Sequence, residues 1–144
     1  NIENAWKQYF AHYQMWPSNN VPANFPENLL SEDLAKVLRG DADAKNQNPD
    51  QVIFMEFTRF AEYEGKQIPV NAWGESGRHK PEDCAFYVMF DHDGDNQLEV
   101  APGAGYAPTN ILRSVAVWSF NPAQTEKAGG TGRDRPKLLG SWMQ

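Results

Sequence analysis

The residues best suited to chemistry lie in one acidic loop, residues 91–97, with the sequence Asp-His-Asp-Gly-Asp-Asn-Gln. Asp91, Asp93 and Asp95 alternate like the first ligands of an EF-hand loop, in which carboxylate oxygens converge on Ca²⁺. The pattern then departs from that motif, because Asn96 stands in place of its glycine and Pro102 in place of its bidentate glutamate. Asp and Gly are also the residues that a tight turn requires for backbone reasons. The loop therefore predicts either a solvated turn or a weak Ca²⁺ site.

The other reactive residue types form no recognisable catalytic constellation. The histidines lack zinc-ligand spacing; they are His12, His79 and His92. Cys84 is the only cysteine and adjoins an apolar strand, so we expect a buried structural thiol and no internal disulfide. The glycine-rich stretch 129–132 lacks the Lys-Ser/Thr ending of a phosphate loop. The sequence thus predicts a protein that is not an enzyme.

Length and composition indicate one folded domain over residues 1–144. Hydrophobic residues make up 40% of the chain and charged residues 22%, which is typical of a globular protein. Nineteen acids against thirteen Lys and Arg give a net charge of -6, which disfavours nucleic acid as a partner. No run within these residues approaches the length of a membrane span.

The opening residues predict an amphipathic helix over 1–16, which Pro17 ends. We see no capping residue ahead of it and interpret it as the lower half of a longer helix. Its apolar side chains recur at three- and four-residue intervals and so share one stripe, which either packs on the domain's own sheet or meets other subunits. The stripe consists of Ile2, Trp6, Tyr9, Phe10 and Tyr13.

The remaining elements predict an α+β fold. A second helix is expected between the N-cap Ser31 and the C-cap Gly40. Strands are expected at 52–57, 68–73, 86–90, 98–100 and 114–119, with 86–90 and 98–100 paired as a hairpin around the acidic loop. Residues 121–136 predict a loop-rich C-terminal region, after which Leu138, Leu139 and Trp142 are expected to hold the tail on the sheet. Helices before strands indicate a helix packed on a small antiparallel sheet.

Several segments also stand in the order and spacing of one protein family. Ala5 to Pro17 is similar to a helix that ends before a proline loop, and residues 48–57 to a segment that follows it. Asn71-Ala72-Trp73-Gly74 is similar to an Asp-Pro-Trp-Gly element, 86–95 to an aromatic strand with an Asp-Gly turn, and 115–122 to a strand ending in Ser-x-Gly-Pro. Together they resemble the type IV pilin superfamily, most closely the major pseudopilins of type II secretion and related bacterial pilin-like proteins.

The resemblance implies a non-enzymatic structural subunit of a type IV pilus or a type II secretion pseudopilus-like filament, assembled from copies of itself and other pilin-like subunits. It also implies about 25 apolar residues before Asn1, which would anchor the chain in the bacterial inner membrane before assembly. The head would then lie in the periplasm or at the cell surface. The aromatic stripe would contribute to helix packing in the filament.

The sequence departs from the family pattern at three places. Asn71 and Ala72 replace Asp and Pro, and residues 75–85 form an insertion. Major pseudopilins often bind Ca²⁺ in the loop after the late strand. The acids there are Glu126 and Asp134, but Arg133 and Arg135 flank Asp134.

Two other classes of function stay open. A cell-surface module could bind glycan or a host protein through exposed aromatics such as Trp16, Trp73 or Tyr106. A Ca²⁺-dependent hydrolase is the remaining alternative, with no recognisable pair of catalytic acids.

Overall fold

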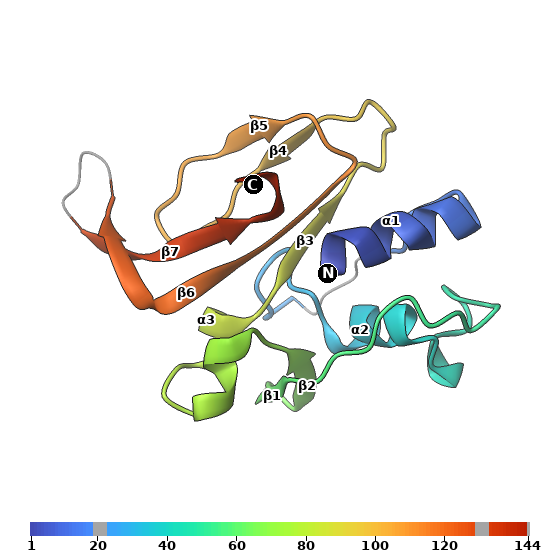
Figure 1. The fold of residues 1–144 in the computed structure, drawn as a ribbon, viewed down its shortest axis with the longest axis horizontal. Coiled ribbons are helices and arrows are strands. Elements are labelled where there is room, and N and C mark those ends of the chain that lie inside the picture. Colours follow the sequence, from blue (N-terminus) through green and yellow to red (C-terminus); the bar gives the residue numbers. More distant parts are fainter. Residues whose placement is uncertain (19–22, 129–132, 144) are drawn as a thin grey trace.

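The computed structural model describes residues 1–18, 23–128 and 133–143; the glycine-rich stretch 129–132 thus lies outside the described residues. Its fold is mixed α and β, with an N-terminal helix and small antiparallel sheets (Figure 1), as the sequence predicts. The described helices are α1 (Ile2–Tyr13), α2 (Glu32–Arg39) and α3 (Pro81–Cys84), with 3-10 turns at Ala42–Ala44, Ala72–Ser76 and Ser141–Met143. The described strands are β1 (Phe60–Tyr63), β2 (Lys66–Pro69), β3 (Tyr87–Phe90), β4 (Leu98–Val100), β5 (Thr109–Ile111), β6 (Val115–Lys127) and β7 (Asp134–Gly140).

Helix α1 is capped at its start, so the expectation that no capping residue stands there is wrong. The side chain of Asn1 accepts a hydrogen bond from the backbone N–H of Asn4 at 3.1 Å, which satisfies one of the free donors of the first turn. The helix ends at Tyr13 and not at residue 16, because Gln14 adopts a left-handed conformation with φ 59°. Its N–H donates to Phe10 O in a C-cap.

Helix α2 confirms the capping prediction. The Ser31 hydroxyl accepts from Leu34 N at 3.2 Å, and Gly40 closes the helix with φ 72°. The backbone of residues 51 and 52 lies so close to Gly40 that a Cβ there would overlap it. The expectation of a strand at 52–57 is wrong. Phe54 N and Met55 N both donate to Leu38 O at the end of α2.

The central sheet has the order β3-β6-β7, with both pairs antiparallel. The predicted hairpin between residues 86–90 and 98–100 is wrong, although both strands form. Strand β3 pairs with the distant β6, with Tyr87 opposite Trp118, and β4 pairs with β5. The expectation of a loop-rich C-terminal region is also wrong. Strand β6 continues to Lys127 and pairs with β7 up to the register in which Lys127 lies opposite Asp134. A register shift between Asn121 and Thr125 interrupts that ladder.

Two apolar clusters lie on the two faces of this sheet. Alternate residues point to opposite faces of a strand, so Val88 and Val117 join α1 and α2 in the first cluster. Tyr87, Trp118 and Phe120 face the second cluster, with side chains from β2, α3 and β4. Figure 1 shows α1 beside β3 on the first side, and β4 and β5 near β7. Among the described residues, no helix combines the length and apolar character needed to cross a membrane.

Candidate functional site

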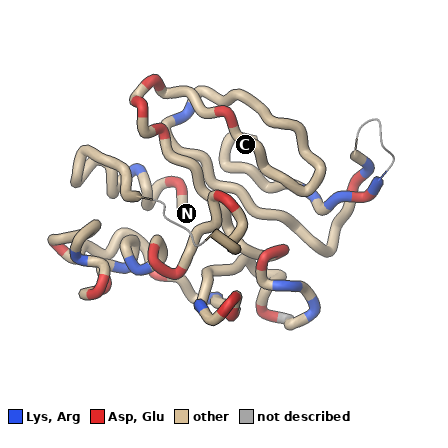
Figure 2. Tube along the Cα trace, turned by 180° about the vertical axis from the view of Figure 1, so that it is seen from behind, with Lys and Arg blue, Asp and Glu red and all other residues tan. Residues whose placement is uncertain are grey.

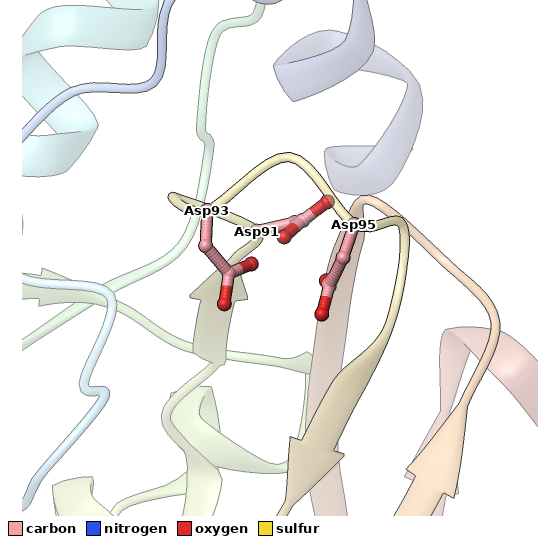
Figure 3. Close-up of side chains that lie close together, drawn as sticks. All are labelled: Asp91, Asp93 and Asp95. Atoms are coloured by element: carbon pink, nitrogen blue, oxygen red, sulfur yellow. The ribbon is translucent and has the colours of Figure 1, made fainter.

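The acidic loop joins β3 to β4, and its first carboxylate organises the turn. Asp91 is buried directly after β3, and its backbone N–H donates to Ser114 O at 2.9 Å. Its two carboxylate oxygens accept from Gly94 N at 3.1 Å and Asn96 N at 2.6 Å. Asp93 and Asp95 are exposed on the same loop, and carboxylate oxygens of all three residues lie within 4.8 Å of one another (Figure 3). The turn predicted from the Asp and Gly residues is therefore present.

The carboxyl groups of this loop perturb one another. A hydrogen bond from Asp93 lowers the pKa of Asp91, and the backbone N–H groups of Asn96 and Gly94 lower it further. The pKa of Asp93 is raised, first by its hydrogen bonds with Asp91 and Asp95 and then by their negative charge. At neutral pH the loop thus concentrates negative charge that a cation would relieve.

The donor set fits a hard cation better than zinc. Three carboxylates supply only oxygen ligands, which Ca²⁺ prefers, and neither histidine nor cysteine joins them in the described structure. Asp134, at the position of the family's Ca²⁺ loop, begins β7 and forms an ion pair with Lys127 at 3.0 Å. Glu126 instead accepts from the Tyr106 hydroxyl and pairs with Arg135. The structure therefore brings together Asp91, Asp93 and Asp95 and leaves Asp134 engaged on the hairpin.

The aromatic stripe of α1 lies mostly in the molecule's own core. Ile2, Trp6 and Tyr9 are buried, and the Trp6 ring meets Phe90 edge-on with centroids 5.0 Å apart. Phe10 and Tyr13 are half-buried at its end, where the Tyr13 hydroxyl donates to Asn48 Oδ1. The opposite side of α1 is exposed. It carries Asn4, Lys7, Gln8, Ala11 and His12.

An apolar groove of about 580 Å³ opens where α1 begins, on the same face of the sheet. Its apolar walls include Ile2, Met55, Val117, Leu139 and Met143. Met143 remains 58% exposed and Leu139 38%, so the groove leaves apolar surface in water. Glu3 lies at its edge and binds Arg113 at 2.9 Å. Sequence reasoning missed this groove because its walls come from segments far apart in the chain.

The aromatics expected to be exposed are half-buried. Trp16 stacks on Phe90 with centroids 5.1 Å apart, and Trp73 packs against the second cluster. Tyr106 is half-buried, and the Arg135 guanidinium lies 3.7 Å from its ring centroid. The expectation of exposed Trp16, Trp73 and Tyr106 is therefore wrong.

Two polar side chains, those of Asn71 and Tyr106, connect strands of the central sheet to neighbouring segments. Asn71 is buried; its Nδ2 donates to Phe120 O at 2.9 Å while its Oδ1 accepts from Trp73 N at 3.2 Å. The Tyr106 hydroxyl accepts from Leu138 N at 3.0 Å and lies 2.7 Å from Pro136 O, so it covers the outer edge of β7. No sequence signal marks the Tyr106 contact, since it joins residues distant along the chain.

Two further residues of reactive types are Cys84 and His12. Cys84 is fully buried, and burial, followed by the charges of Asp83 and Glu82, raises the pKa of its thiol to about 11. His12 is exposed and lies 2.8 Å from an oxygen of Asp50. The buried thiol expected at Cys84 is confirmed.

Comparison with known proteins adds no relative. No family model, curated protein or solved structure matches this chain.

Proposed function

We propose that the chain is the head of a pilin-like filament subunit, with a structural and non-enzymatic role. One observation carries the proposal: the first helix packs its aromatic stripe on one face of an antiparallel sheet, and an apolar groove continues along that face from the start of the helix. A helical segment placed before Asn1 would have an apolar surface to cover there. Such a segment, apolar throughout, would anchor the subunit in the inner membrane before assembly.

The motifs of the resemblance support the same reading through their structural roles. The Asn71-Ala72-Trp73-Gly74 turn connects β2 to α3 and is tied to β6 through Asn71 and Phe120 O. A Cβ at Gly74 would overlap the side chain of Val70, so this position needs glycine. The motif residues thus tie this turn to strand β6.

Filament contacts would use the exposed side of α1 and the segment before it. Ile2, Trp6 and Tyr9 are already buried within the head, so their contribution to a filament is to keep the helix on the sheet. Phe10 and Tyr13, which are half-buried, lie beside surface that a neighbour could cover. Other pilin-like subunits could share these contacts, because the helix presents the same side to each.

A Ca²⁺ ion in the acidic loop is part of this proposal. Convergence of three carboxylates and an all-oxygen donor set support it. The ion would neutralise the carboxylates whose hydrogen bonds, and then charges, raise the pKa of Asp93, and it would brace the connection from β3 to β4. Its role would be structural.

The filament reading is tested by the product of the complete coding sequence. We expect about 20 or more apolar residues before Asn1 and fractionation of that product with inner membranes. A coding sequence without such a segment would overturn the proposal. The aromatics named for the glycan-binding alternative are half-buried, so no observation favours that alternative over the filament, and we propose no second function.

A further inference from the structure

A second hollow lies on the face of the sheet opposite α1. It has a volume of about 550 Å³, within the range of sites that hold small molecules. Its apolar floor includes Tyr87, Met89 and Phe120. We call this hollow the acidic pocket, because its rim carries acids and, among the described residues that line it, neither Lys nor Arg. The acids of the rim are Glu27, Glu82, Asp83 and Glu99.

The walls of the acidic pocket come from three segments, and each is hydrogen-bonded to the central sheet. Asn28 O accepts from the backbone of β3 at 2.8 Å. The Tyr87 hydroxyl donates to Glu82 O at 2.7 Å and so ties α3 to β3. The Trp118 indole N–H in β6 donates to Pro102 O at 3.3 Å. The pocket is therefore formed before any ligand arrives, and binding would cost little ordering of its walls.

The rim carboxylates have no ion pair with any described residue. By contrast, Glu3 lies 2.9 Å from an Arg nitrogen and Asp43 lies 2.8 Å from a Lys nitrogen. The charge of the rim also acts on its neighbours. Burial, followed by the charges of Asp83 and Glu82, raises the pKa of the Tyr87 phenol. A cation entering the pocket would thus meet carboxylates that no Lys or Arg of the described chain neutralises.

The rim acids do not gather like the ligands of a metal ion. Among the described residues, only the acidic loop brings oxygens of three carboxylates within 4.8 Å of one another. Figure 2 shows, from behind, acidic positions on separate segments of the chain, those of α3 and β4 among them. An organic cation with several charges can span such a rim, because the methylene groups between its charges can lie on the apolar floor.

We propose that the acidic pocket binds a linear polyamine, a ligand whose ammonium groups are separated by methylene chains. The ammonium groups pair with carboxylates of the rim, and the methylene chains cover Tyr87, Met89 and Phe120. This binding goes beyond the filament role and is independent of it. Filaments formed by a product that binds no polyamine would remove the pocket assignment and leave the filament proposal standing.

The test is isothermal titration calorimetry of the 144-residue chain with spermidine, which carries three positive charges at pH 7. We expect saturable binding at about 10 mM salt and weaker binding at about 150 mM, where the Debye length falls from about 30 Å to about 8 Å. Hexaamminecobalt(III) has the same charge but no methylene groups, and it should bind about tenfold more weakly. Absence of saturable spermidine binding, or equal binding of the two cations, overturns the proposal.

Substitutions locate the binding. The pocket variant, Glu27→Gln with Glu99→Gln, should bind spermidine about tenfold more weakly than the parent chain. Both side chains are exposed, so we expect the variant to fold, and circular dichroism checks this. Glu56→Gln with Glu62→Gln removes the same charge from exposed positions that do not line the pocket, and should bind like the parent chain. Equal weakening by the two variants overturns the assignment.

A further control separates the pocket from the acidic loop. Asp93→Asn with Asp95→Asn removes two exposed carboxylates from that loop and should leave spermidine binding unchanged. A loss as large as that of the pocket variant would place spermidine at the loop and overturn the proposal. A short lysine-containing peptide that binds more tightly than spermidine would assign the pocket to a protein partner, and would overturn the polyamine assignment as well.

Discussion

At the scale of single residues, Asp91 and Asp93 have opposite effects on stability. The lowered pKa of Asp91 means that its contribution is present above its ordinary pKa of 3.8 and is lost as the pH falls through the lower folded value. The raised pKa of Asp93 means that its charge destabilises the fold above that raised value. That cost disappears as the pH falls below 3.8, its ordinary pKa.

We therefore expect Asp93→Asn to raise the melting temperature at pH 7 in metal-free buffer, and Asp91→Asn to lower it. The difference between the two variants should shrink as the pH approaches about 4. Ca²⁺ should raise the melting temperature of the parent chain more than that of Asp93→Asn, with Mg²⁺ as the control ion. Thermal unfolding followed by circular dichroism measures each effect. Equal shifts from both substitutions at pH 7 would contradict this description of the loop.

Asn71 offers a second test at this scale. Asn71→Ala removes the donor to Phe120 O and leaves that buried carbonyl without this partner. The free energy of unfolding should fall by about 1–3 kcal/mol. Urea unfolding measures it, with the exposed Asn110→Ala as a matched control that should change stability by less than about 0.5 kcal/mol. A loss at Asn71 no larger than that of the control would show that the turn is not anchored through this bond.

At the scale of elements, α1 has two sides with different tasks. Trp6 is fully buried, so Trp6→Ala should lower the free energy of unfolding by about 3–5 kcal/mol. Ala11 is exposed, so Ala11→Trp should leave the head folded and reduce filament formation by the complete product. Urea unfolding and sedimentation of assembled product measure the two effects. A stable Trp6→Ala head would contradict the packing of the stripe on the sheet.

The edge of β7 gives another element-scale prediction. Tyr106→Phe removes the oxygen that meets Leu138 N and Pro136 O, and should cost about 1–3 kcal/mol. Amide exchange at Leu138 should accelerate. The Val88 amide, which donates to Asn28 O at the opposite edge of the sheet, should not change. Unchanged exchange at Leu138 would mean that Tyr106 does not protect this edge.

The elements also show where sequence reasoning succeeds and where it stops. Helix α2 was predictable because Ser31 and Gly40 act on their own neighbours in the chain. The pairing of β3 with β6 was not, because residues 91–114 separate the two strands and the Asp91 turn looked like a hairpin to the next strand in sequence. The acidic loop was predictable from spacing alone. The groove and the Tyr106 contact were not, since each joins residues that only the folded chain brings together.

At the scale of the whole molecule, the two faces of the sheet have different surroundings. One face carries α1 and the apolar groove, where the proposed preceding helix would continue. The other face carries the acidic pocket, whose apolar floor includes Tyr87, Met89 and Phe120. A subunit of this design would be held in a filament by apolar burial along the face that carries α1.

Electron microscopy tests the central claim most directly. Source cells that carry the complete gene would be sheared, and the released material labelled with antibodies against residues 1–144. The account predicts label along filaments, and loss of those filaments when the gene is deleted. Label confined to dispersed protein, with no filament in the sheared fraction or the envelope, would contradict it.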